Sequence, residues 1–463
     1  STETKMFCGC KLSFGAEPNI HTCPICLAHP GVLPVPNEQA LRYALLIAAA
    51  LECEVAPRSI FHRKNYFYPD SPKAYQISQY DIPLASNGRL GDVRIHRAHL
   101  EEDAAKMIHV GESGRIHGSG ASLVDFNRGG TPLVEIVTEP DLRSAAQAAE
   151  WARLLRTTIR ALAVSDVNME EGSLRCDANV SLRPIGSEKL GTKTELKNMN
   201  SFRFLQRGVE AELARQRGLL DAGQKVRQET LHFDPQSGDL TPLRSKEQAH
   251  DYRYFPEPDL VPLAPTEEML RGARESLPEL PAARIERYQG QMGLAPGAAA
   301  LLAADPETAA YFEQAVAAAG DLEARIIANW VTGELAAALR QAGGGAGAAE
   351  SRVKPESLAK LIVMTQEKRI SHGSAKAVLG ALVAEGGDPT AIVMREGLAQ
   401  LADGAELESI VEAAIAANPA AAQQVRNGNQ KAIGAIVGAV MRETKGRADG
   451  GEVNKLIAEK LSL

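Results

Sequence analysis

The chain has 463 residues, of which 44% are hydrophobic and 24% charged, and this length exceeds that of one hydrophobic core, so we expect two or three domains. The formal net charge of −7 means that the chain as a whole does not attract nucleic acid, and any RNA contact requires a local basic patch. No apolar run approaches the roughly 18 residues that span a bilayer, and residues 1–5 lack a signal-peptide pattern, so we expect a cytoplasmic protein with no membrane contact.

Four of the six cysteines form two close pairs near the N-terminus, Cys8 with Cys10 and Cys23 with Cys26. Two such pairs can hold a tetrahedral zinc ion while the segment between them folds back as a knuckle. The alternative is four ordinary core cysteines, which the spacing and the polar intervening segment disfavour. Four thiolates leave no open coordination position, so we predict structural rather than catalytic Zn²⁺.

Residues 95–103 form a predicted strand that is rich in metal-binding and acid–base side chains. A period of two places Arg97, His99, Glu101 and Asp103 on one face and Glu102 on the other, unless a bulge or a turn changes this. Carboxylate clusters suit Mg²⁺, which proteins usually hold through one or two carboxylates and the phosphates of a substrate. The alternative is a charge run on the surface.

Residues 174–183 alternate without a break between apolar and polar side chains, which predicts a strand. Taken alone, this pattern favours an ordinary half-exposed antiparallel strand. A similar polar face recurs nearby, where Lys193, Glu195 and Lys197 alternate in residues 191–197. Several strands that present mixed charges to one side predict a concave polar site, suited to phosphate and metal.

The composition changes after residue 262 to Ala, Leu and Glu with helical spacing. Residues 343–350 have the glycine-rich composition of a flexible linker, and residues 351–463 form a second helical block. The sequence therefore predicts an α+β multidomain protein: a β-rich domain at 1–262, an all-α domain at 263–342, the linker, and an all-α tail.

The sequence lacks two common catalytic motifs. Gly186 and Gly191 have the separation of a phosphate-binding loop, but residues 192–194 break its pattern, which excludes a standard P-loop. No G-x-S-x-G nucleophile elbow is present either.

Longer strings of residues carry a more specific signal than these motifs. They lie at 63–70, 73–79, 122–128, 170–179, 195–198 and 251–259. Together they resemble the B subunit of the tRNA-dependent amidotransferase GatCAB across essentially the whole chain. This resemblance implies a cradle-shaped N-terminal domain, a helical domain and a YqeY-like tail.

The implied activity is that of a carbon–nitrogen ligase that works in a heterotrimer with the A and C subunits. ATP phosphorylates the side-chain carboxylate of Glu-tRNA(Gln), Asp-tRNA(Asn) or both, and ammonia released from glutamine in the A subunit displaces the phosphate. Phosphoryl transfer mainly requires positioning and charge neutralisation, which a polar cradle can supply. The alternative is a non-catalytic tRNA-binding scaffold of the same complex.

The resemblance also implies roles for individual residues. Glu102 is expected to bind Mg²⁺, with His99, Glu101 and Asp103 as catalytic neighbours. The residues expected to contact the ATP phosphates or the tRNA terminus are Lys64, Lys73, Arg175 and Lys197. The set Cys8, Cys10, Cys23 and Cys26 matches the zinc ligands that some family members carry. Family members begin with a G-L-E-V-H strand that completes the Mg²⁺ site, and we expect this strand to be missing before Ser1.

The tail contains a predicted helix with a basic end. Residues 431–445 have one apolar face, and Arg442, Lys445 and Arg447 follow at the end of the helix. Such side chains can contact the phosphates of a mischarged tRNA. The alternative is a solvated basic helix end, and the resemblance to YqeY-like tails favours tRNA binding.

Overall fold

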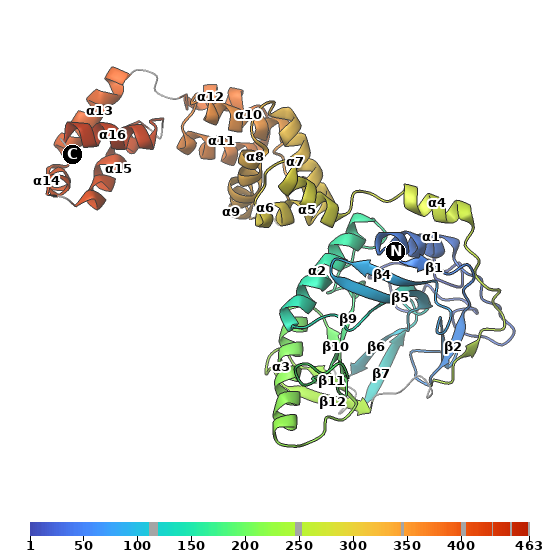
Figure 1. Cartoon of the computed structure of the whole chain (residues 1–463). Coiled ribbons are helices and arrows are strands. Elements are labelled where there is room, and N and C mark those ends of the chain that lie inside the picture. The colour runs from blue at the N-terminus through green and yellow to red at the C-terminus, as the bar shows by residue number, and fades with distance from the viewer. Residues whose placement is uncertain are drawn as a thin grey trace. The chain divides into compact units, whose positions relative to one another are not determined.

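The computed structural model describes residues 1–463 except 111–118, 246–251, 344–346, 400–403, 428, 445–446 and 462–463. Its contacts divide the chain into two compact units, Ser1–Leu280 and Pro281–Leu463 (Figure 1). Every described strand belongs to the first unit, and the second is built from helices. This arrangement confirms the predicted α+β multidomain class.

A four-stranded antiparallel sheet forms the centre of the first unit, in the order β1-β4-β5-β8. Its strands are β1 (Glu54–Val55), β4 (Ala85–Leu90), β5 (Val93–Glu102) and β8 (Pro132–Thr138). Helix α1 (Glu38–Ala50) packs against one face, where the small side chains of Ala48, Ala85 and Ala98 meet. The helix begins at Asn37, whose side chain accepts a hydrogen bond from the Ala40 amide.

A second four-stranded sheet has the order β12-β11-β10-β9. Its strands are β9 (Cys176–Val180), β10 (Thr194–Met199), β11 (Glu229–Phe233) and β12 (Leu240–Ser245). Strands β10 and β11 run parallel because α3 (Phe202–Asp221) connects them as a crossover, and α2 (Ala145–Ala161) packs along α3 (Figure 1). The burial of β9 alternates along the strand, which confirms the predicted apolar and polar faces.

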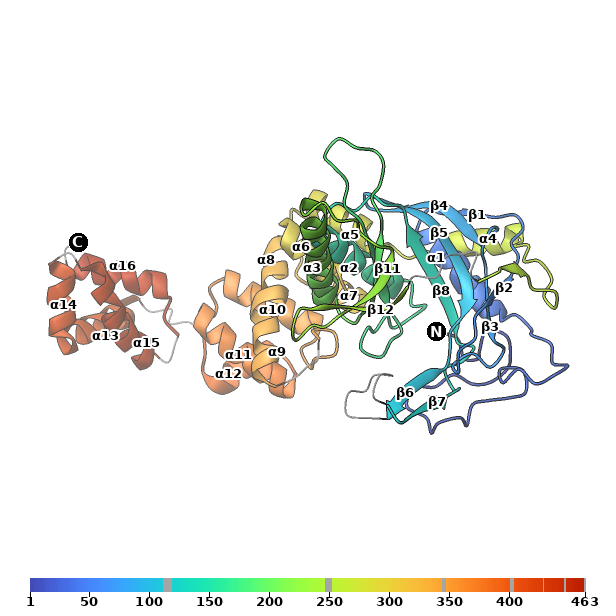
Figure 2. The same cartoon turned by 90° about the horizontal axis from the view of Figure 1, so that it is seen from below.

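Two smaller sheets and one helix complete the first unit. Strands β13 (Phe255–Pro256), β2 (His62–Asn65) and β3 (Tyr75–Ser78) form one sheet, and β6 (Lys106–Val110) and β7 (Ala121–Asp125) form a hairpin (Figure 2). Helix α4 (Glu267–Glu275) packs on α1, and Leu277 and Leu280 reach the core beneath α2. The first compact unit therefore extends beyond the predicted boundary at residue 262, because these apolar side chains continue its core.

The second unit begins with helices that join one hydrophobic core. They are α5 (Pro281–Gly290), α6 (Pro296–Ala303), α7 (Pro306–Ala318), α8 (Ala324–Asn329), a π-helical segment η1 (Trp330–Leu335), α9 (Ala336–Gln341), α10 (Pro355–Gln366), α11 (His372–Glu385) and α12 (Pro389–Glu396). Proline occupies the first position of several of these helices, where its missing N–H leaves no hydrogen bond unmade.

A separate core joins the last helices, α13 (Gly404–Ala417), α14 (Pro419–Arg426), the 3₁₀ segment η2 (Gln430–Ala432), α15 (Ile433–Glu443) and α16 (Gly450–Lys460). The packing therefore does not follow the predicted linker at residues 343–350. Ala348 and Val353 belong to the first helical core, and the Tyr311 hydroxyl donates a hydrogen bond of 2.9 Å to the Val353 carbonyl. Glycine content alone did not reveal that apolar residues around it continue this core.

No single helix of the described residues is long and apolar enough to cross a membrane. Helices α11 and α12 pass the test of length and composition only as a pair, and the two are bent by 115°.

Candidate active site and metal centre

A bulge in β5 determines which side chains face the site. The register between β5 and β8 shifts by one residue between Ile95 and Arg97, so β5 contains an extra residue. Ile95 is buried in the core before the bulge and Leu100 after it. The side chains of Arg97, His99 and Glu101 therefore lie on the sheet face opposite α1.

Three of the side chains on this face could hold a metal ion. The His99 Nε2 atom lies 3.2 Å from a Glu135 oxygen and 3.7 Å from a Glu101 oxygen. The Ser78 hydroxyl donates a hydrogen bond of 2.9 Å to Glu101. Ligand atoms of His99, Glu101 and Glu135 all lie within 4.8 Å of one another. An imidazole and two carboxylates are a suitable donor set for a divalent cation.

Charges within this cluster stabilise one another. Burial opposes the charged form of His99, but its interactions with Glu101 and Glu135 outweigh burial and raise its pKa. Partial desolvation opposes the charged form of Glu135, whose side chain is 46% exposed, yet His99, Lys64 and Arg97 together lower its pKa to about 2. These carboxylates favour a proton on His99, and a divalent cation could take the place of that proton, because metal binding releases such protons.

Glu102 has different neighbours from Glu101. Its carboxylate lies 2.6 Å from the Lys73 ammonium group and accepts a 2.9 Å hydrogen bond from the Ile77 amide. This ion pair, in which Glu102 is buried and Lys73 half-buried, borders a cavity of about 200 Å³. Residues that line the cavity include Lys5, Phe7, Cys26, Lys73, Tyr75 and Glu102. The structure thus brings two predicted site residues, Lys73 and Glu102, into direct contact.

The remaining predicted cations of the first unit lie in different places. Arg175 lies 2.6 Å from the Asp103 carboxylate, so it joins the carboxylate cluster from the segment before β9. Lys197 instead pairs with Asp177 at 2.7 Å within the second sheet. Lys64 lies close enough to Glu135 to lower its pKa. The roles of these residues stay predictions.

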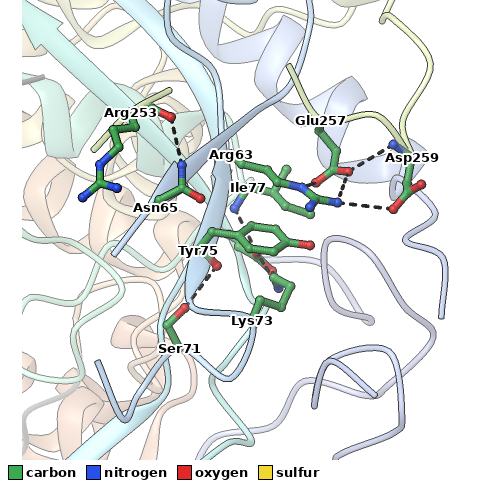
Figure 3. A network of polar contacts seen from close by, with 10 residues as sticks. Arg63, Asn65, Ser71, Lys73, Tyr75, Ile77, Arg253, Glu257 and Asp259 are labelled. Carbon is green, nitrogen blue, oxygen red and sulfur yellow. Dashed lines mark hydrogen bonds and ion pairs between the residues drawn. The ribbon is translucent and has the colours of Figure 1, made fainter. Parts of the chain in front are cut away.

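An ion pair fixes one wall of the cavity (Figure 3). The Arg63 guanidinium donates to both oxygens of Glu257, at 2.7 and 2.8 Å, and lies 4.4 Å from the centre of the Tyr75 ring. The Glu257 side chain has no exposed surface, and Asp259 lies 3.3 Å from the same guanidinium. These contacts hold β13 against β2 and fix Tyr75 at the cavity wall.

The four N-terminal cysteines come together as predicted. Their sulfur atoms lie within 4.8 Å of one another and could hold a metal ion. A hydrogen bond from Cys8, with help from the Lys5 ammonium group, lowers the pKa of Cys26 to about 4. Lys5 Nζ lies 3.5 Å from this sulfur and 2.9 Å from the Phe126 carbonyl oxygen. The pKa of Cys10 is instead raised to about 11, mainly by burial. The sulfur cluster borders the cavity at Glu102.

Sequence reasoning missed Glu135 and assigned no site role to Arg97. Glu135 is the single charged residue of β8, whose other residues are apolar apart from Thr138. A lone carboxylate in such a strand was the available signal. Its partner could not be identified without the pairing of β5 and β8, which places Glu135 directly opposite His99.

Comparison with known proteins identifies the family to which this sequence is similar. Residues 1–271 match the GatB/GatE catalytic domain, and residues 310–461 match the GatB domain. The B subunit of the aspartyl/glutamyl-tRNA(Asn/Gln) amidotransferase of Moorella thermoacetica is 49% identical to the chain, over 99% of the chain and 97% of the relative. The corresponding B subunits of Carboxydothermus hydrogenoformans (48%, over 100% of the chain and 96% of the relative) and Geobacter sulfurreducens (47%, over 99% and 96%) are similarly close.

These similarities define the chain as an amidotransferase subunit with a catalytic role in a ligase complex. More particularly, the chain belongs to the GatB family.

Proposed function

We propose that this chain activates the side-chain carboxylate of Glu-tRNA(Gln), Asp-tRNA(Asn) or both, by transferring a phosphoryl group from ATP. A carboxylate is a poor acyl donor, whereas an acyl phosphate has a good leaving group that ammonia can displace. The observation that carries this proposal is the carboxylate cluster of β5, which presents a metal-capable group on one face of the sheet and the Lys73–Glu102 pair on the other. Such a site supplies charge and position but no nucleophile, as phosphoryl transfer requires.

We propose that Mg²⁺ neutralises the phosphates in this reaction. The group His99, Glu101 and Glu135 supports this ion, because its ligand atoms lie within 4.8 Å of one another. The resemblance assigns the ion to Glu102, but both Glu102 oxygens already accept hydrogen bonds, from Lys73 and from the Ile77 amide. Binding of a metal at Glu102 would therefore require Lys73 to move away, and Lys73 would then be free to contact a phosphate.

We also propose that the four cysteines hold a structural zinc ion. The chain assembles with the A and C subunits, and its location is cytoplasmic. The donor set of four sulfur atoms supports zinc, because closed thiolate sites are typical of structural zinc ions. The relatives are named as subunits, which supports a partnership with other chains.

The ATP site can be located in the assembled enzyme by photo-crosslinking with an azido derivative of ATP. We expect the label to be attached to this chain and to be displaced by unlabelled ATP. We also expect hydroxylamine to trap an aminoacyl hydroxamate on the tRNA only when ATP is present, because it attacks an acyl phosphate. Labelling confined to the partner subunits would instead support the alternative, a scaffold that binds tRNA without phosphorylating it.

We further propose that the last helical core binds tRNA through its basic residues. Arg442 is exposed in the last turn of α15, and the Arg447 side chain lies against the Thr444 carbonyl; Lys445 falls outside the described residues. We expect replacement of Arg442 by Gln to weaken tRNA binding several-fold. The slope of the logarithm of the binding constant against the logarithm of the salt concentration should also become less steep by about one unit. Equilibrium binding at several salt concentrations measures this, with Lys455→Gln on α16 as the control. An unchanged salt slope would contradict the assignment.

A further inference from the structure

Strand β3 packs against β5 but belongs to a different sheet, and side chains join the two strands. The Gln76 side chain donates a hydrogen bond of 2.7 Å to the Glu102 carbonyl oxygen, and the Ile77 amide donates one of 2.9 Å to the Glu102 carboxylate. Just after β3, the side-chain oxygen of Gln79 accepts a hydrogen bond of 3.1 Å from the Leu100 amide. These contacts hold β3 in place along the part of β5 that carries the carboxylates.

Ser78, the last residue of β3, directs its hydroxyl group at one of these carboxylates. The hydroxyl donates a hydrogen bond of 2.9 Å to the Oε2 atom of Glu101. The same oxygen atom lies 3.7 Å from the Nε2 atom of His99. Ser78 and Glu101 are both buried, so water does not readily replace this donor.

A second buried serine shows what a purely structural hydroxyl does in this part of the fold. The Ser59 hydroxyl donates a hydrogen bond of 2.8 Å to the backbone carbonyl of Ile82. Side-chain hydrogen bonds within proteins most often end on the backbone in this way. The Ser78 hydroxyl instead ends on a side chain of the metal-capable group.

The Glu101 carboxylate needs such a contact to keep one orientation. The last torsion angle of a glutamate side chain has broad minima, so the position of the residue on the strand does not fix the plane of its carboxylate. Carboxylates that bind metal ions are usually held by hydrogen bonds from residues outside the coordination sphere. The Ser78 hydroxyl keeps the Oε2 atom of Glu101 on the side of His99.

We infer that Ser78 is a positioning residue, whose hydroxyl group sets the orientation of the Glu101 carboxylate within the group that also contains His99 and Glu135. This inference rests on the proposed function, in which a divalent cation binds to that group. Ser78 acts through Glu101 and is not itself a ligand. Its loss should therefore weaken binding of the ion more than it slows the reaction once the ion is bound.

The test titrates the assembled enzyme with Mn²⁺, which suits the same oxygen ligands as Mg²⁺ and is counted by electron paramagnetic resonance. The ion whose binding is lost in Glu101→Gln defines the site. We expect Ser78→Ala to weaken binding of this ion about 10-fold, as loss of an outer hydrogen bond to a ligand does. In the same variant, the free Mg²⁺ concentration that gives half of the maximal ADP formation should rise by a similar factor, while the rate at saturating Mg²⁺ stays nearly unchanged.

Ser59→Ala is the matched control, because it also removes one buried hydroxyl group that donates a single hydrogen bond of similar length. We expect both variants to lower the temperature of thermal unfolding by a similar amount. The Mn²⁺ affinity of Ser59→Ala should equal that of the unchanged enzyme.

The outcomes separate a positioning role from packing and from failure of the proposed function. Unchanged Mn²⁺ affinity in Ser78→Ala, or an equal decrease in Ser59→Ala, would overturn the positioning role and leave the proposed function intact. An equal number of bound ions in Glu101→Gln and in the unchanged enzyme would overturn the metal group, and the inference with it. Absence of ADP formation that depends on Glu-tRNA(Gln) or Asp-tRNA(Asn) in the unchanged enzyme would overturn the proposed function itself.

Discussion

Replacement of Glu102 by Gln is expected to lower ATP cleavage by the assembled enzyme at least about 100-fold. The amide oxygen can still accept the hydrogen bond from the Ile77 amide, so the backbone of β3 keeps its position. The lost charge is the one that holds Lys73 at 2.6 Å and that could bind a metal ion. The measurement is formation of ADP that depends on Glu-tRNA(Gln) or Asp-tRNA(Asn).

Two further variants separate the causes of this loss. Glu139→Gln removes an exposed carboxylate just after β8, where it pairs with His96, and should leave the rate unchanged. The double variant Lys73→Gln with Glu102→Gln shows whether the two residues act as a unit, since coupled residues do not give additive losses. Full activity of Glu102→Gln would exclude this residue from the reaction.

Replacement of Cys23 and Cys26 by Ser is expected to lower the zinc content of the purified chain from about one ion to none. Serine hydroxyl groups do not replace thiolates as zinc ligands, and two remaining sulfur atoms cannot close a tetrahedral site. Mass spectrometry of the metal after purification without chelators measures this. Cys53→Ser and Cys176→Ser are matched controls, because these thiols lie outside the cluster.

Loss of zinc should also loosen the segment between the cysteine pairs. Asn19 and His21 in this segment hydrogen-bond to Asp125 and Asn127 at the end of β7, so the hairpin should become more accessible to protease as well. Zinc content unchanged by the double replacement would refute the site.

The sequence predicts those features that depend on local periodicity. The strand around Glu101, the alternating faces of β9 and the clustering of four cysteines all follow from spacing along the chain. Pairings between distant strands cannot be predicted in this way, because the register of two strands is not apparent from the spacing of residues in a single sequence. Lys73 with Glu102 and His99 with Glu135 are contacts of this second kind.

The bulge in β5 shows the limit most clearly. Strict alternation placed Arg97, His99 and Glu101 on one face, and this holds within the strand after the bulge. Extended backwards, the same alternation would place the fully buried Ile95 on the polar face. One inserted residue reverses the phase, and only pairing with β8 reveals it. The second limit lies at the predicted linker, where composition suggested a flexible segment but Ala348 belongs to the first helical core.

The contact of Arg63 with Glu257 has a consequence for the synthesis of the chain. The two residues lie 194 positions apart, yet their contact supports Tyr75, which lines the cavity. At about 5–20 residues per second, a ribosome needs roughly 10–40 s to add the segment that carries Glu257 after Arg63 has been made. During that interval β2 lacks its edge strand β13, and the Arg63 charge lacks its carboxylate. The nascent first unit can therefore complete the sheet of β13, β2 and β3 only after this interval.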